Sequence, residues 1–147
     1  MKVFLGFDHK GLLIKDCVLD ALRKMDVDFE ISSIINNSDD DYIDFAEDVC
    51  SCVLKTPNSF GILVCGTGIG MSIGANKIKG IYCAKVDDCD DAYYARLHND
   101  ANVLAMGIKH EIEEIVQIIE TFLNTSTSMD KRYKNRRDKV IKLETGE

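Results

Sequence analysis

Residues 61–72 read GILVCGTGIGMS, and this stretch decides the fold. Its first four residues form a short apolar run, and a loop follows with glycine at positions 66, 68 and 70. A buried strand that leads through a glycine-rich turn into a helix beginning near Met71 is typical of a parallel α/β sheet. Glycines let the backbone bend tightly and turn its N–H groups toward a bound oxygen, so the loop also predicts an anion hole.

Similar apolar segments rich in β-branched residues recur at 3–7, 29–35, 81–86 and 102–106, and each is a predicted strand. Apolar residues three and four positions apart predict helices over residues 12–25, 43–54 and 110–123. The alternation indicates one α/β domain over residues 1–147, a three-layer αβα sandwich around a five-stranded parallel sheet with right-handed crossovers. Because the segments hardly alternate in polarity, we expect strands that are buried on both faces.

Composition limits the possible partners and the compartment. The net charge of −7 argues against nucleic-acid binding, which needs clustered cations. The longest apolar runs are far shorter than a membrane span, so we expect no membrane association and a cytoplasmic location. Because no export signal is evident, we expect the six cysteines to be reduced thiols. They form no C-x-x-C pair, which predicts no structural zinc.

Ligands of such sheets bind beyond the carboxyl ends of the strands, so the residues that follow each strand are candidate site residues. Asp8 and His9 follow the first strand, Cys65 the third, and Lys109 comes shortly after the fifth. Cys65 is also close to a helix N-terminus, which stabilises a thiolate, so it is a candidate base or nucleophile. The alternative is a small buried residue that ends a strand.

Other interpretations of the glycine loop are weaker. The dinucleotide fingerprint lacks its third glycine, since Met71 stands there, although Asp87 has about the spacing expected of the ribose-binding acid.

The polar cluster at residues 96–102 contains His98, which is either an acid or base, or part of a turn. A basic run near the C-terminus predicts a helix over about residues 130–143 that either binds a small anion or is a solvated face.

Four motifs together resemble the family of type B ribose-5-phosphate isomerases and the related galactose-6-phosphate isomerases. They are GxDH at residues 6–9, DYxDFA at 41–46, CGTGIGMSIxANK at 65–77 and HNDANV at 98–103. The resemblance implies a flavodoxin-like or Rossmann-like sandwich without metal or organic cofactor. It also implies a homodimer or homotetramer with sites at the subunit interface, where the C-terminal helix packs on a partner subunit.

The resemblance further implies interconversion of ribose 5-phosphate and ribulose 5-phosphate, a step of the pentose phosphate pathway, through an enediolate. Asp8 and His98 would open the sugar ring, and Cys65 would be the base. The implied enediolate-binding residues, through their backbone N–H groups, are Gly66, Thr67, Gly68 and Gly70. The implied phosphate ligands are His9, Lys109, Arg132 and Arg136, and the residues near the sugar hydroxyls are Asn99 and Tyr42.

The chain departs from the family pattern at several positions. Met71 stands where one branch has a glutamate base, which favours Cys65 in that role. The other departures are Lys109 and Tyr82 for common arginines, Tyr133 for a histidine and Ile43 for a proline. Two alternatives remain: an isomerase of six-carbon sugars such as allose or galactose 6-phosphate, and a non-catalytic nucleotide-binding module.

Overall fold

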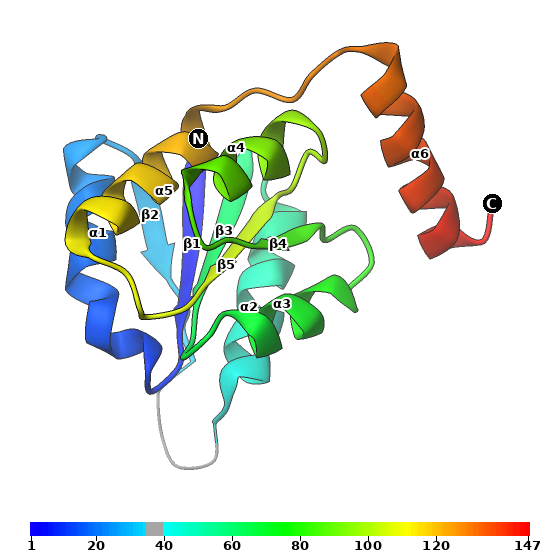
Figure 1. Cartoon of the computed structure of the whole chain (residues 1–147). Helices are drawn as coiled ribbons and strands as arrows, with labels where there is room; N and C mark the ends of the chain where they lie inside the picture. Colours follow the sequence, from blue (N-terminus) through cyan, green and yellow to red (C-terminus); the bar gives the residue numbers. More distant parts are fainter. Residues whose placement is uncertain (35–39) are drawn as a thin grey trace.

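The computed structural model describes residues 1–34 and 40–147. The strands are β1 (Lys2–Phe7), β2 (Asp28–Ile31), β3 (Ser59–Val64), β4 (Cys83–Lys85) and β5 (Val103–Met106). The helices are η1 (Gly11–Ile14), α1 (Lys15–Lys24), α2 (Tyr42–Lys55), α3 (Ile69–Asn76), α4 (Cys89–Leu97), α5 (Ile112–Asn124) and α6 (Lys131–Thr145). Strands and helices alternate along the chain up to α5, as the sequence predicts (Figure 1).

The strands form one parallel five-stranded sheet in the order β2-β1-β3-β5-β4. This differs from the flavodoxin order 2-1-3-4-5 only in its last two strands. Right-handed crossovers explain the layers: connections that run toward β2 place α1 and α4 on one face, and those that run the other way place α2 and α3 on the opposite face. The predicted three-layer αβα sandwich is confirmed.

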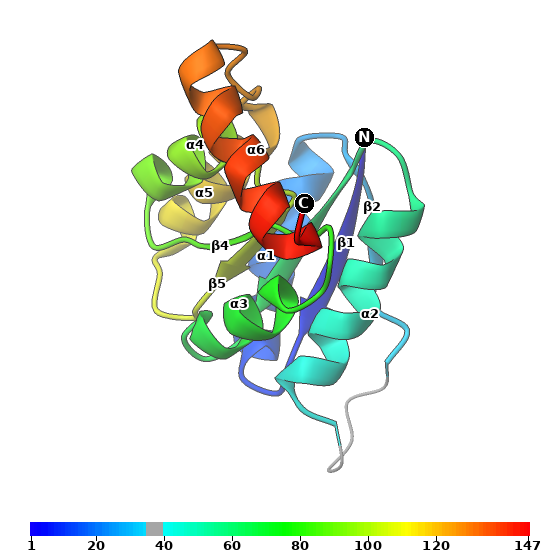
Figure 2. The same ribbon diagram turned by 90° about the vertical axis from the view of Figure 1, so that its right-hand side faces the viewer.

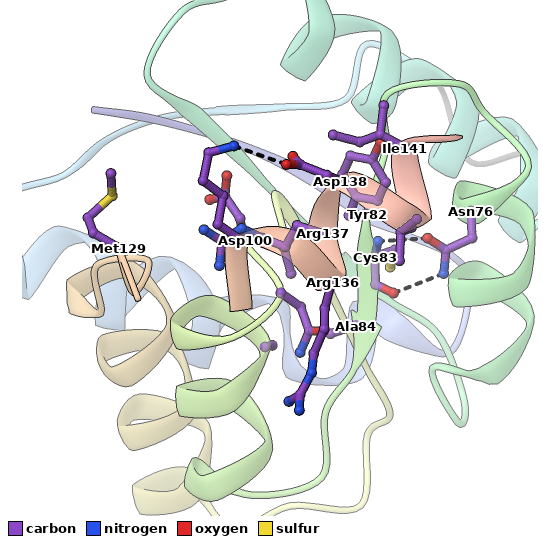
Figure 3. A pocket seen from close by; sticks show the side chains of 15 residues that line it. Asn76, Tyr82, Cys83, Ala84, Asp100, Met129, Arg136, Arg137, Asp138 and Ile141 are labelled. Carbon is purple, nitrogen blue, oxygen red and sulfur yellow. Dashed lines mark hydrogen bonds and ion pairs between the residues drawn. The ribbon is translucent and has the colours of Figure 1, made fainter. Parts of the chain in front are cut away.

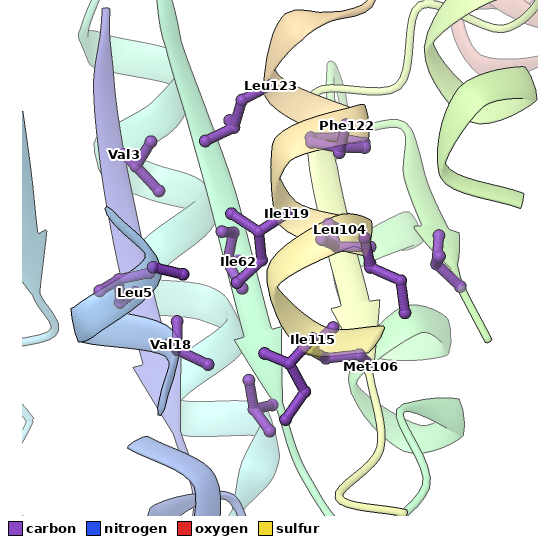
Figure 4. Packing of buried hydrophobic residues seen from close by; sticks show 14 of the residues in the cluster. Val3, Leu5, Val18, Ile62, Leu104, Met106, Ile115, Ile119, Phe122 and Leu123 are labelled. Atoms are coloured by element: carbon purple, nitrogen blue, oxygen red, sulfur yellow. The ribbon is translucent and has the colours of Figure 1, made fainter. Parts of the chain in front are cut away.

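A hydrophobic core lies on each face of the sheet. Under α1, α4 and α5, side chains such as Leu5, Ile62, Ile119 and Phe122 pack together (Figure 4). Under α2 and α3, a second cluster includes the fully buried Met71. The central strands β1, β3 and β5 are therefore buried on both sides, which fixes the position of the loops at their carboxyl ends.

The prediction of burial on both faces is wrong for the edge strands, because β2 is largely exposed and β4 is half-buried. The predicted strand over residues 29–35 ends at Ile31; the N–H of Ser32 still donates to the carbonyl of Leu5 in β1, while its hydroxyl donates to Asp48 of α2. Residue 35 lies outside the described residues. The predicted strand over 81–86 is shortened at its start, because the N–H of Tyr82 donates to the side chain of Asn102.

The predicted helices need smaller corrections. The segment 12–25 begins as the 3-10 turn η1 before it becomes α1, the segment 110–123 becomes helical only at Ile112, and the helix after the glycine loop starts at Ile69. Helix α6 extends slightly beyond the predicted 130–143 and has no buried residue (Figure 2). None of the helices in the described ranges has both the length and the apolar character of a bilayer span.

Replacing Phe122 by alanine tests the core under α5. The side chain is fully buried and meets Phe60 edge to face with ring centroids 5.8 Å apart. We expect Phe122→Ala to lower the free energy of unfolding by about 3–5 kcal/mol, measured by urea denaturation. Ile112→Ala, on the exposed first turn of the same helix, should change it by less than about 0.5 kcal/mol. Equal effects of the two substitutions would contradict this assignment of the core.

Candidate active site

Asp8 and Cys65 lie side by side at the carboxyl edge of the sheet. The last residues of β1 and β3, Phe7 and Val64, are paired, and the N–H of Asp8 donates to the carbonyl of Val64 over 3.2 Å. The chain leaves β1 toward α1 on one face and leaves β3 toward α3 on the other, so the two strand ends form a topological switch point, where ligands of such sheets bind. The structure therefore brings together the predicted base and one of the predicted ring-opening groups.

The glycine loop wraps around the thiol of Cys65. The N–H of Gly68 donates to the sulfur over 3.1 Å, and the Cys65 side chain is buried. Gly68 has φ +80°, and a Cβ there would lie 2.9 Å from the carbonyl carbon of Met106, so both conformation and space require glycine. An amide hydrogen that faces the sulfur stabilises negative charge on it. The N–H of Ile69 is held by the Thr67 hydroxyl.

Two side chains from other segments reach this loop. The ring of Tyr42, at the start of α2, lies so close to Gly70 that a Cβ there would be 2.7 Å from it. The side chain of Lys10 lies across Gly66, with Nζ 3.9 Å from the position a Cβ would take. Lys10 is not among the residues predicted from the sequence, although it directly follows Asp8 and His9 and so shares their strand end. It adds a positive charge beside the predicted anion hole.

His9 and Lys109 complete this group of residues at the carboxyl edge. His9 follows Asp8 in the loop that leaves β1, and Lys109 lies three residues beyond β5; both are exposed. The loop after β5 is tied to the glycine loop, because the N–H of Ile108 donates to the carbonyl of Gly66. Both residues thus follow strands that neighbour β3 in the sheet.

The remaining predicted residues lie at the opposite end of the sheet. His98 caps the C-terminus of α4, which runs back from the carboxyl edge, and Asn99 follows it. Between this turn and the level of Cys65 lies the length of β5, four residues or roughly 13 Å at about 3.3 Å per residue. A single chain therefore does not bring His98, Asn99, Arg132 and Arg136 to the thiol.

The turn that carries His98 is held firmly. Arg96 is buried, and its guanidinium donates to Asp100 over 2.9 Å and to the carbonyl of Ala101 over 2.6 Å. Arg137 of α6 donates to the backbone carbonyl of His98 over 3.2 Å. The imidazole itself contacts two phenol rings, those of Tyr94 and Tyr133. The sequence analysis did not assign either tyrosine to the site.

Helix α6 and the edge of β4 enclose a hollow of about 510 Å³ (Figure 3). Asn99 and Arg136 line it, together with apolar side chains such as Val140 and Ile141. On its far wall, the side-chain amide of Asn76 exchanges two hydrogen bonds with the backbone of Cys83, which covers the exposed edge of β4. The hollow belongs to the His98 end of the sheet and does not reach the glycine loop residues.

Two of the other thiols, those of Cys50 and Cys83, are shielded from water. Burial raises the pKa of Cys50 to about 12 and also raises the pKa of Cys83 well above its usual value. These two side chains therefore remain protonated near neutral pH. Across residues 1–34 and 40–147, no group of three or more His, Cys, Asp or Glu side chains is arranged to hold a metal ion.

A sequence model described as Ribose/Galactose Isomerase matches residues 3–140. The chain belongs to this family. The matched region contains both groups of candidate residues, from Asp8 and Cys65 to His98 and Arg136.

Relatives within this family can be aligned with nearly the whole chain. A probable ribose-5-phosphate isomerase B of Mycoplasma pneumoniae is 35% identical, over 97% of this chain and 94% of the relative. The ribose-5-phosphate isomerase B of Mycobacterium tuberculosis is 31% identical, over 98% and 90% of the two chains. Among solved structures, the type B ribose 5-phosphate isomerase of Leishmania infantum matches with TM-score 0.89 and 39% identity, over 99% of this chain and 97% of that one.

Glu144 ties the C-terminal end of α6 back to the body of the protein. Its carboxylate accepts from the N–H of Gly80 over 2.9 Å and from the hydroxyl of Tyr82 over 3.0 Å. Burial, and then the hydrogen bond to Glu144, raise the pKa of Tyr82 above its usual value. The protonated phenol is thus favoured in the folded state, and this contact is lost as the pH rises through the raised pKa of Tyr82, above about 10.

Glu144→Gln tests this tie. We expect the pKa of the Tyr82 phenol to fall but to stay above its usual value, because burial remains; tyrosine ring NMR against pH measures it. Asp138→Asn is the matched control, since it removes a carboxylate from α6 that contacts Lys134 instead. A pKa of Tyr82 that is unchanged in Glu144→Gln would show that the carboxylate does not hold the phenol.

Proposed function

We propose that this protein is an aldose-ketose isomerase that interconverts ribose 5-phosphate and ribulose 5-phosphate, with Cys65 as the base. The observation that carries the proposal is the thiol of Cys65 beside Asp8, with the N–H of Gly68 3.1 Å from its sulfur, in a chain of this isomerase family. The names of the relatives, ribose-5-phosphate isomerase B, support the choice of substrate.

The reaction begins on the ring form of the sugar. Ring opening breaks the bond between C1 and the ring oxygen; the ring oxygen gains a proton and the C1 hydroxyl loses one, which gives the open aldehyde. Asp8 and His98 are the groups proposed for these transfers. The thiolate of Cys65 then removes the proton from C2, and the electron pair moves to make the enediolate.

Backbone donors of the glycine loop hold the enediolate oxygens. Because the N–H of Gly68 faces the sulfur, the donors left for substrate oxygen are those of Gly66, Thr67 and Gly70. Lys10, across Gly66, adds positive charge on the same side. A proton then passes from the C2 oxygen to the C1 oxygen, and return of the proton from Cys65 to C1 gives the ketose. Met71 contributes no base here, because its thioether is only a weak acceptor, and its side chain is fully buried in the core.

The proposed site is shared between two copies of the chain, in a homodimer or homotetramer. The roughly 13 Å of β5 between Cys65 and His98 supports this, since neither the paired strands nor helix α4 can bend to close that gap. In a twofold dimer each carboxyl edge receives the partner's turn and α6, so that His98, Asn99, Arg132 and Arg136 of one chain complete the site of the other. His9 and Lys109 would bind the phosphate together with the two arginines.

The proposal includes a cytoplasmic location and a place in the pentose phosphate pathway. The proposed location is supported by the six cysteines, all within the described ranges, which are free thiols, as is usual in a reducing compartment. The relatives' names give the reaction on which the pathway assignment rests.

The purified protein should convert ribose 5-phosphate into ribulose 5-phosphate, and Cys65→Ala should lower kcat by at least about 10²-fold, because it removes the base. A coupled or direct absorbance assay of the ketose measures both. Cys52→Ala, a partly buried cysteine of α2 distant from the glycine loop in sequence, is the control and should keep its activity.

The same assay with allose 6-phosphate separates the two sugar lengths. Turnover of the six-carbon sugar alone would keep the mechanism and change the substrate. No turnover of either sugar, with tight calorimetric binding of NAD or ATP, would replace the isomerase by a nucleotide-binding function.

Mixed dimers test the shared site. Cys65→Ala and His98→Ala proteins should each be nearly inactive, but a hybrid dimer contains one site with both residues intact. After subunit exchange at equal concentrations, about one quarter of the wild-type activity should return, since half of the dimers are hybrids with one good site each. Native mass spectrometry confirms the exchange. Hybrids that form without any gain in activity would exclude a site shared in this way.

A further inference from the structure

Tyr133 of α6 stacks on the imidazole of His98. The two ring centroids are 3.9 Å apart and the planes differ by 9°. Tyr94, one turn earlier on α4, contacts the same imidazole at 4.9 Å and 36°. His98 itself lies at the C-cap of α4, where its side chain is only half-buried. The orientation of its ring therefore depends on these aromatic neighbours more than on its own helix.

Tyr133 also contacts both arginines that are proposed to bind the phosphate. The guanidinium carbon of Arg132 lies 4.7 Å from the centroid of the tyrosine ring, and that of Arg136 lies 5.4 Å from it. Cations at this distance from an aromatic ring are attracted by its π electrons. One ring thus contacts the proposed ring-opening histidine and both guanidinium groups.

We propose that Tyr133 is a positioning residue that fixes the imidazole of His98 relative to the guanidinium groups of Arg132 and Arg136. Phosphate bound at the arginines then places the sugar ring oxygen at a set distance from the imidazole. Stacking covers a face of His98 and leaves the ring edge, which carries both nitrogens, available for proton transfer. This inference rests on the proposed isomerase function and adds a positioning residue to the proposed site.

The aromatic ring of Tyr133, and not its hydroxyl, carries the role. All three contacts are made to the ring, and in the described part of the chain the hydroxyl makes no hydrogen bond. Tyr133→Phe should therefore behave like the wild type. Tyr133→Leu removes the stack but keeps an apolar side chain of similar reach, and should slow net conversion by about tenfold, the effect of losing a good aromatic pair.

A ratio of two rates separates positioning from general damage. With ribulose 5-phosphate in D₂O, Cys65 removes a proton from C1, the thiol exchanges it for a deuteron, and return to C1 leaves labelled ketose. Release of ring-form ribose 5-phosphate needs the further ring closure that is assigned to Asp8 and His98. If Tyr133 positions His98, Tyr133→Leu should raise the ratio of C1 deuteration to aldose formation several-fold, whereas a smaller fraction of folded enzyme would leave the ratio unchanged.

The measurement uses NMR on the full-length protein, with Tyr133→Gln run in parallel as a second ringless variant that favours helix. Tyr93→Leu is the matched control: it makes the same change on an exposed ring that contacts Tyr94 but not His98. A raised ratio in the ringless variants, and a wild-type ratio in Tyr133→Phe and Tyr93→Leu, would support the proposal. An unchanged ratio in ringless variants that remain active would overturn only the positioning role of Tyr133. An inactive wild type would overturn the proposed isomerase function itself.

Discussion

The hydrogen bonds at the carboxyl end of β3 set the geometry on which the candidate site depends. Val64 accepts from the N–H of Asp8 on one side, and the N–H of Cys65 donates to Met106 on the other, so three strand ends stop at one level. The loops that leave them are packed backbone to backbone: a Cβ on Gly11 would lie 2.1 Å from the carbonyl oxygen of Val64. Carboxylate and thiol are therefore placed by the sheet and by close backbone packing, which leave little room for adjustment.

The same parallel register keeps the two groups of residues apart within one chain. Helix α4 starts at the carboxyl edge and runs antiparallel to the strands, so its C-cap, His98, must lie at the amino edge. Packing of α4 on α5, with Ala92 and Ala95 buried, holds it there. A change of loop conformation cannot bring His98 to Cys65, whereas a second chain can. This is the physical argument for a site shared by two subunits in the proposed oligomer.

The sequence predicts the central strands and the carboxyl-edge residues well, because burial on both faces leaves a continuous apolar run and because ligand sites of α/β sheets follow strand ends. It does not predict where the edge strand β4 begins, since the side chain of Asn102 accepts a hydrogen bond from the N–H of Tyr82, and this contact has no local signature in the sequence. The stacking of Tyr133 on His98 joins residues distant in sequence, and only the path of α6 brings them together.

Among the helices of the described residues, α6 is packed least completely within one chain, since it has no buried residue. A basic helix of 15 residues with no buried side chain gains little stability in water from its own propensity. It is held near its middle by Arg137, which donates to the carbonyls of Ser128 and His98, and near its end by Glu144. Between these ties the helix passes beside a hollow with Val140 and Ile141 in its lining. In the proposed dimer, apolar contacts from the second chain would cover this middle section, so the packing that orders α6 would also deliver Arg132 and Arg136 to the partner's thiol.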